Sequence, residues 1–271
     1  MRLFGHKMPL KAQIGLLIVI ASALAALLAP ILAPYPEADV LGRAWAAPSA
    51  QHWLGLDNLG RDVLSRLLYG ARLSIGLSLL ITMLSFTLGV FNGFSAAVLG
   101  KTIDMILSRV VDLLLSMPAL IFAMVVLSVL GTDLAVLIVT IAILDATRIF
   151  RVSRSLAMNI ATLDFVEAAK LRGEGLWWIL RREILPNAMA PLVAEFGLRF
   201  CFTFLFISAL SFLGLGIQPP NADWGSMVKD YSAMIMLGVP TVFYPAGAIA
   251  TLTIGINLLV DWLVSTSAAK R

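Results

Sequence analysis

Charged side chains gather between residues 164 and 187 of an otherwise apolar chain, and this stretch reads DFVEAAKLRGEGLWWILRREILPN. Its residues favour helix, and glycines at 173 and 175 interrupt it. Large aromatic side chains in a water-facing segment are rarely left uncovered. The chemistry that this stretch could do is therefore recognition of another surface, a protein or the membrane face, rather than a reaction.

Residues that could hold a metal ion or a nucleotide are few. The two histidines, His6 and His52, are expected on opposite sides of a membrane, and Cys201 is the single cysteine. Gly100-Lys101-Thr102 resembles the end of a phosphate-binding loop, but Ser95 stands where the first glycine of that loop belongs. We expect no catalytic residue, no metal and no cofactor in this chain, and no disulfide within it.

The composition defines the fold class. Of 271 residues, 60% are hydrophobic and 13% are charged, and the mean hydropathy is +0.94. Soluble domains are not built this way, and about 20 apolar residues suffice for a transmembrane helix. We predict an all-α integral membrane protein. Charge-free runs indicate spans at 12–33, 73–100, 113–132, 200–222 and 231–260, and a sixth at about 134–150, with Asp145 and Arg148 near the headgroups.

The distribution of Lys and Arg predicts the orientation. Fourteen of these residues lie in the N-terminal segment, the alternate loops on the same side and the tail. Five lie on the other side: Arg43, Arg61, Arg66, Arg72 and Lys229. By the positive-inside rule both termini, residues 1–11 and the loop at about 151–191 are cytoplasmic, and residues 34–72 are a periplasmic loop. This topology explains the net charge of +4 without nucleic acid binding.

Small residues recur at four-residue spacing in the second expected span, at Ser85, Gly89, Gly93 and Ala97. In lipid such a stripe lets helix backbones approach closely, so we predict a helix-packing face. Asn92 lies beside it and could face either a neighbouring helix, which we favour, or a translocation path. At the start of the helix expected to span 200–222, Glu195 and Arg199 have the spacing of an ion pair on one helix face.

Local signals divide the charged stretch into two short helices. Asp164 and Glu167 have the spacing of a capping box, and Gly173 is expected to break the first helix after about two turns. The second helix is expected from about Leu176 to near Pro186, and the side chains expected to be exposed include Trp177, Trp178 and Ile179. Spacing alone leaves two interpretations open: a docking knob, or an amphipathic hairpin lying on the membrane.

Three stretches resemble one family. Glu167-Ala168-Ala169, Gly173 and Leu185-Pro186 resemble the EAA loop of bacterial ABC importer permeases. The sequences QHWLGLDNLGRDVLSRLLYGAR at 51–72 and LSFLGLGIQPP at 210–220, the latter followed by Asp-Trp-Gly, are similar to the C-type permease of oligopeptide, dipeptide and nickel importers. One departure is Glu183, where the EAA pattern has an apolar residue; Ile184 is expected to fill that role after a one-residue shift.

The resemblance implies a type I ABC importer permease fold of six transmembrane helices in the bacterial inner membrane, with residues 73–271 as the permease domain. It implies a homologous second permease and two cytoplasmic ATPases, which hold ATP and magnesium. An extracytoplasmic solute-binding protein would deliver a peptide, a nickel chelate or a similar small solute. The residues that the resemblance assigns to ATPase coupling are Glu167, Ala168, Ala169, Gly173, Trp177, Arg181, Leu185 and Pro186.

Two other function classes remain as alternatives. A self-contained secondary transporter would need ionisable or unwound elements at mid-membrane, and the expected spans at 12–33, 73–100, 113–132 and 231–260 carry no charge. A membrane scaffold subunit is the other.

Outside the membrane, Arg61 and Arg66 can pair with Asp57 and Asp62. We favour a loop that stabilises itself in this way over a surface that receives a binding protein.

Overall fold

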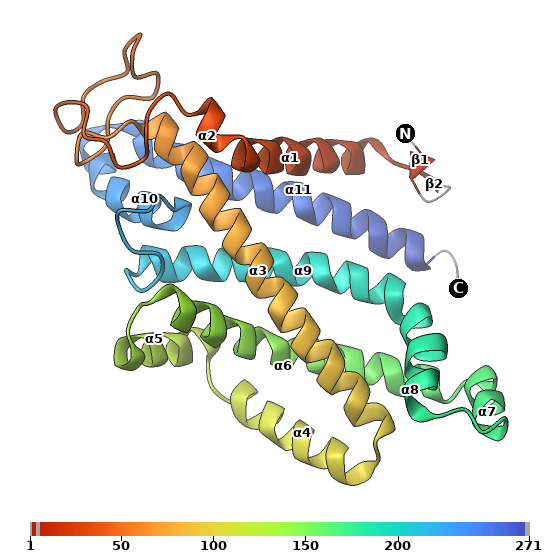
Figure 1. Cartoon of the computed structure of the whole chain (residues 1–271). Coiled ribbons are helices and arrows are strands. Elements are labelled where there is room, and N and C mark those ends of the chain that lie inside the picture. The colour runs from red at the N-terminus through yellow and green to blue at the C-terminus, as the bar shows by residue number, and fades with distance from the viewer. Residues whose placement is uncertain (1, 4–5, 269–271) are drawn as a thin grey trace.

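The computed structural model describes residues 2–3 and 6–268, and these are almost entirely helical (Figure 1). Lys270 and Arg271, part of the predicted cytoplasmic tail, lie outside the described residues. The elements are β1 Arg2–Leu3, β2 His6–Lys7, α1 Leu10–Leu27, α2 Ala29–Leu32, α3 Val63–Val98, α4 Lys101–Leu115, α5 Ala119–Leu130, α6 Leu134–Ala161, α7 Asp164–Leu171, α8 Leu176–Ile179, a π-helical turn Leu180–Ile184, α9 Leu185–Phe212, α10 Trp224–Ser232, 3₁₀ turns Ala233–Leu237 and Pro240–Val242, and α11 Phe243–Ala268.

The long helices run between two ends of the molecule. One end carries residues 33–62 and α10, and the other carries α7 and α8, where α1 begins and α11 ends (Figure 1). Within the described residues, four helical segments are long and apolar enough to cross a membrane: Leu10–Leu27, Val63–Val98, Leu176–Phe212 and Pro240–Thr266. A fifth is added if α4 and α5 together form one broken span.

The third predicted span, 113–132, is wrong as a continuous helix. The chain bends by 84° between α4 and α5, at a break that includes Pro118. Proline lacks an amide donor and disfavours a helical conformation in the residue before it. Because α5 has 12 residues, it reaches about 18 Å, short of a hydrocarbon core of about 30 Å.

Several other predicted helix limits are also wrong. Helix α3 begins at Val63, where Asp62 accepts a hydrogen bond from the Ser65 amide at 2.8 Å and caps it. Helix α9 ends at Phe212 instead of 222, just before Gly214 adopts a φ of +84°. The last long helix begins at Phe243 instead of residue 231, after a left-handed Gly238. Turn geometry, rather than hydropathy, limits these helices.

Ion pairs hold the segment before α3 together, as predicted. The Asp57 carboxylate is 2.7 Å from Arg61 Nε and 3.3 Å from Arg66 Nε, and all three side chains are buried. His52 Nδ1 lies 3.0 Å from Asp62 Oδ1. These contacts make residues 52–66 a folded unit at the start of α3.

A second link joins the loop after α9 to α3. Asp223 caps α10 and accepts a hydrogen bond from Ser74 at 2.8 Å. Burial raises the pKa of the Asp223 carboxyl. Glu37 accepts a hydrogen bond from the Ala222 amide at 2.7 Å. The loop after α9 is therefore attached both to α3 and to the segment that precedes α3.

Candidate functional site

The small-residue stripe of α3 lies against α6. A Cβ at Gly89 would be 2.6 Å from Ile149 Cβ, and one at Gly93 would be 2.8 Å from the Phe150 carbonyl oxygen. Asn92 lines a small space between α3, α4 and α6, and its amide donates to Leu88 at 2.8 Å. The two helices thus approach closely at these glycines, and Asn92 faces neighbouring helices.

The same close approach occurs between α1 and α11, which the sequence analysis did not identify. A Cβ at Gly15 would lie 2.6 Å from the Gly255 carbonyl oxygen. Each helix contributes one glycine, so no repeated spacing within either helix could reveal the contact.

Helix α7 presents one face outward and buries the other. Val166 and Ala169 are fully buried, whereas Glu167 and Ala168 are exposed. The predicted capping box is wrong, because Asp164 is the first helical residue and Leu163, with no side-chain cap, occupies the N-cap. Both acidic residues still lie in the first turn, where the helix dipole favours negative charge.

Gly173 ends α7 as predicted. Its φ of +80° is left-handed, and a Cβ there would meet nothing within 4 Å. The Gly173 amide donates to Lys170 at 2.9 Å and the Glu174 amide to Ala169 at 3.2 Å, the bond pattern of a Schellman motif. The requirement for glycine at this position is conformational and not steric.

The second predicted helix of this segment begins at Leu176 but does not end near Pro186. It continues through the π turn into α9, so 176–212 is one helical segment. The Leu185 amide reaches back five residues to the Leu180 carbonyl. The wider π turn carries the helix past Pro186, at the start of α9, where a proline is tolerated.

The π turn also explains the one-residue departure from the EAA pattern. Ile184 is fully buried, whereas Glu183 is only partly buried and lies 4.0 Å from Arg172. The predicted shift is therefore confirmed. Ile179, expected to be exposed, is 1% exposed and packs in the same cluster. We call residues 164–187 the coupling segment.

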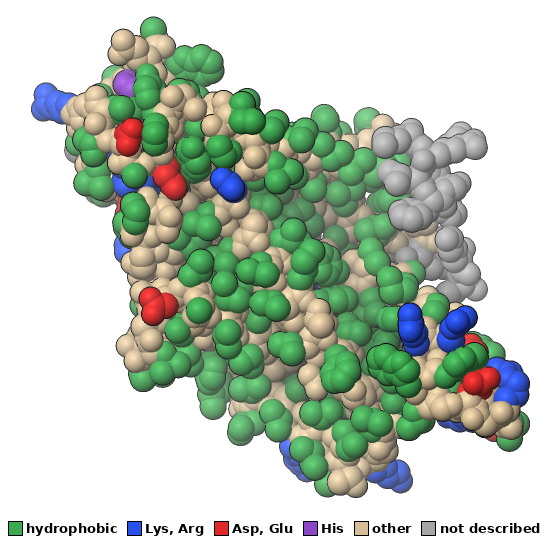
Figure 2. Space-filling model, in the orientation of Figure 1, with side chains coloured by type: hydrophobic (Ala, Val, Ile, Leu, Met, Phe, Trp, Pro, Cys, Tyr) green, Lys and Arg blue, Asp and Glu red, His purple; other side chains and the backbone are tan. Residues whose placement is uncertain are grey.

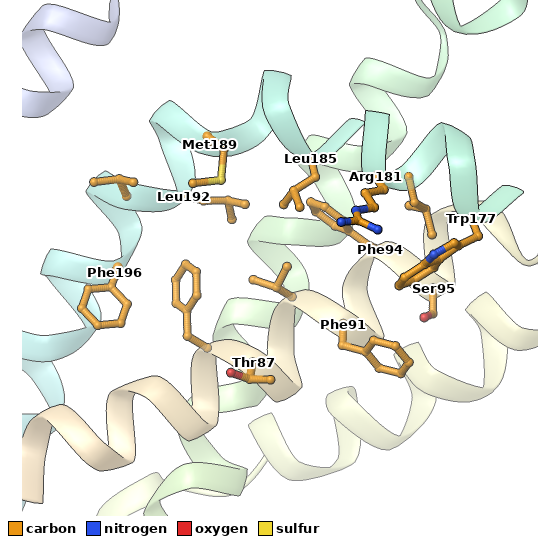
Figure 3. A pocket seen from close by; sticks show the side chains of 14 residues that line it. Thr87, Phe91, Phe94, Ser95, Trp177, Arg181, Leu185, Met189, Leu192 and Phe196 are labelled. Atoms are coloured by element: carbon orange, nitrogen blue, oxygen red, sulfur yellow. The ribbon is translucent and has the colours of Figure 1, made fainter. Parts of the chain in front are cut away.

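The remaining predicted coupling residues face a different direction. Trp177, Arg181 and Leu185 line a groove that runs along α3, together with Phe91 and Phe94 (Figure 3). Pro186 is exposed. The eight residues predicted to act together are therefore divided: Glu167 and Ala168 lie on the outward face of α7, Ala169 is buried beneath that face and Gly173 forms the turn after it, while only the three groove residues face α3.

A cluster of charged residues lies inside the bundle. Asp145 of α6 is 3% exposed, and its carboxylate lies 3.5 Å from Arg199 Nη1 and 3.3 Å from Thr203 Oγ1, both in α9. Helix α6 extends from Leu134 to Ala161, so Asp145 lies near its middle rather than near its end. Arg148 stacks 4.1 Å from the Phe202 ring centre.

The predicted pair of Glu195 and Arg199 is confirmed, with Oε1 and Nε 2.8 Å apart. Asp145 extends it into a network across two helices. A charge in the middle of an apolar run was the only signal in the sequence, and it did not identify the partner helix.

Residues 85–270 match the family of binding-protein-dependent transport system inner membrane components. The chain belongs to this family. The permease is 35% identical over 254 residues to the dipeptide transport system permease protein DppC of Alkalihalophilus pseudofirmus, a match that covers 93% of this chain and 83% of the relative. It is 32% identical over 251 residues to the glutathione transport system permease protein GsiD of Pectobacterium atrosepticum, covering 92% and 83%.

A putative peptide transport system permease protein of Brucella abortus is 36% identical over 269 residues, covering 97% of this chain and 88% of the relative. Among solved structures, an amino acid ABC transporter crystallised with histidines matches with a TM-score of 0.53 and 19% identity, covering 77% of this chain and 95% of the other. At that identity the likeness concerns the fold. The permease is thus an all-helical ABC importer subunit of the inner membrane.

Proposed function

We propose that the permease pairs with a homologous second permease to form the path for a peptide, a nickel chelate or a similar small solute. An extracytoplasmic binding protein would deliver the solute, and two cytoplasmic ATPases, which hold ATP and magnesium, would drive its import. The relatives are named as permeases for dipeptides, peptides and glutathione, and these names favour a peptide as the solute. In this proposal the chain itself supplies no catalytic residue.

The proposed topology has six spans: α1, α3, the bent pair α4–α5, α6, α9 and α11. Both termini would be cytoplasmic together with the coupling segment, and residues 33–62 and α10 periplasmic. The Lys and Arg distribution supports this orientation, as does the position of α7 and α8 at the end where α1 begins and α11 ends (Figure 1).

The outward face of α7 is our proposed ATPase contact, with Glu167 and Ala168 exposed and Gly173 shaping the turn. The observation that carries this proposal is that the segment is both exposed and firmly attached. Val166, Ala169, Ile179 and Ile184 pack into one buried cluster, which also disfavours a hairpin lying loosely on the membrane.

This attachment suits the transmission of movement. Helix α6 ends two residues before α7 begins, and α8 continues directly into α9. A displacement of α7 by a closing ATPase dimer would therefore pull on two long helices at once. Rigid movement of packed helices around such a contact is a common way of switching between states.

A secondary transporter is the main rival. The charged cluster of Asp145, Arg148, Glu195 and Arg199 is the kind of mid-membrane element that such a transporter uses. Its two acids and two bases compensate one another, however, which suits a structural role equally well. Purified permeases, ATPases and binding protein in proteoliposomes separate the alternatives: we expect uptake only with ATP and all subunits. Uptake by the permeases alone under an ion gradient would refute the proposal, and retained uptake without this chain would favour a scaffold.

Topology has its own test. Ser155 and Ser49 are both exposed, so cysteines introduced there can react with a membrane-impermeant reagent. The native Cys201 is buried and provides a low background. In intact spheroplasts we expect Ser49→Cys to react and Ser155→Cys to react only after permeabilisation. Labelling of both before permeabilisation would overturn the orientation.

A further inference from the structure

The groove beside α8 and α9 has polar and apolar ends. It encloses about 530 Å³ between α3 and the helical segment 176–212. Ser95, Trp177 and Arg181 lie at one end, and Phe196 and Thr87 at the other (Figure 3). The wall between them is almost entirely aliphatic or aromatic: Phe86, Val90, Phe91, Phe94, Leu180, Leu185, Met189, Leu192 and Val193.

The length of the groove corresponds to one leaflet of a bilayer. From Phe86 to Ser95 it follows ten residues of α3, and the nine steps between them rise by about 14 Å. Half of a hydrocarbon core of about 30 Å is about 15 Å. The polar end lies close to the coupling segment, which the proposed topology places at the cytoplasmic surface.

The polar end offers a cation with no acid to neutralise it. Within the residues that the structure describes, Arg181 makes no ion pair, and its guanidinium points toward the groove mouth beside Trp177 (Figure 3). Ser95 donates no hydrogen bond to any described group either. Thr87, at the apolar end, is satisfied by the Met83 carbonyl at 2.8 Å. Unmet polar groups are therefore concentrated at one end.

We propose that this groove binds an anionic phospholipid of the cytoplasmic leaflet, with an acyl chain along α3 and the phosphate at Arg181 and Ser95. Basic pockets between membrane helices on the cytoplasmic side suit anionic headgroups, and tryptophan favours the same depth. The lipid supplies the negative charge that the protein lacks. This inference rests on the proposed orientation but on neither ATPase docking nor transport.

A helix of the second permease is the competing occupant. It would have to bring a carboxylate to Arg181 and leave the groove closed to lipid. A bound lipid instead places an exchangeable, flexible acyl chain between α3 and the helix that continues from the coupling segment. The occupancy of the groove would then influence how easily these two helices move past each other.

Native mass spectrometry of the full-length permease, purified with the subunits that accompany it, tests the proposal without ATP or transport. Delipidated protein is titrated with dioleoyl phosphatidylglycerol or dioleoyl phosphatidylcholine. We expect one phosphatidylglycerol to be retained in preference to phosphatidylcholine. Arg181→Gln should weaken this retention about five-fold, since one basic residue near a headgroup contributes about 1 kcal/mol.

Two further variants make the result specific. Val193→Trp places an indole in the groove and should abolish retention even where the arginine remains. Arg182→Gln is the matched control, because Arg182 is exposed and adjacent but does not line the groove. Equal retention by the wild type, Arg181→Gln and Val193→Trp would overturn the proposal. Photocrosslinking of a benzophenone amino acid, introduced in place of Met189, to the second permease in the native membrane would also overturn it, in favour of a protein occupant.

Discussion

Removal of the Arg199 guanidinium should destabilise the permease more than the loss of any exposed charge. Arg199→Leu leaves Asp145, which is 3% exposed, and Glu195 without the cation that lies between them. Breaking a buried ion pair by deleting one partner costs about 3–5 kcal/mol. Arg148 remains near Asp145 and compensates part of the charge, so we expect the lower end, about 3 kcal/mol.

Thermal unfolding of the detergent-purified protein, followed by tryptophan fluorescence, measures this effect. About 3 kcal/mol corresponds to a fall in Tm on the order of 10 °C for a chain of this size. The Asp145→Leu and Arg199→Leu double variant should recover part of the loss, because Asp145 is no longer left without its cation, while Glu195 still is. The coupling between the two sites is then read from the double-mutant cycle.

Arg151 provides the matched control. Its guanidinium lies 2.6 Å from Asp112, but both side chains are more than half exposed, and such pairs contribute about 0–1 kcal/mol. Arg151→Leu should therefore shift Tm little. If Arg199→Leu has no greater effect than Arg151→Leu, the charges between α6 and α9 are solvated, and the cluster does not join these helices.

Two glycine comparisons test the packing and the coupling segment. Gly89→Leu should lower the free energy of unfolding by about 1–3 kcal/mol, because a Cβ added there would lie 2.6 Å from Ile149. Gly76→Leu in the same helix meets open space and should be neutral. Equal Tm values for the two variants would show that α3 and α6 do not touch at Gly89. Gly173→Asp and Gly173→Ala should insert normally but lose ATP-dependent uptake and ATPase co-purification, since a φ of +80° resists a side chain. Gly175→Ala, in equally open space at a φ of −71°, should retain both, and a functional Gly173→Asp variant would remove the basis for the coupling role. Glu167→Lys reverses a charge in the first turn of α7 and should reduce ATPase co-purification without affecting insertion.

The sequence by itself determined the membrane class and the approximate positions of most long apolar helices. Hydropathy, charge-free runs and the positive-inside bias are sums over neighbouring residues, so they can be read without a fold. Gly173 was also predictable, because a helix that breaks at a glycine reflects a local backbone preference. The family motifs identified the importer class, and the shift from Glu183 to Ile184 followed from comparing the pattern one residue at a time.

Only the tertiary structure decided which surfaces these residues occupy. Trp177 and Arg181 face α3 rather than lying with Glu167, because they belong to the helical segment that continues into α9 and packs beside α3. The partner of Asp145 could not be predicted, since it is Arg199, 54 residues later in the chain. A charge can stay buried between helices when a distant helix supplies its partner, and the energy of that pairing has no local pattern in the sequence.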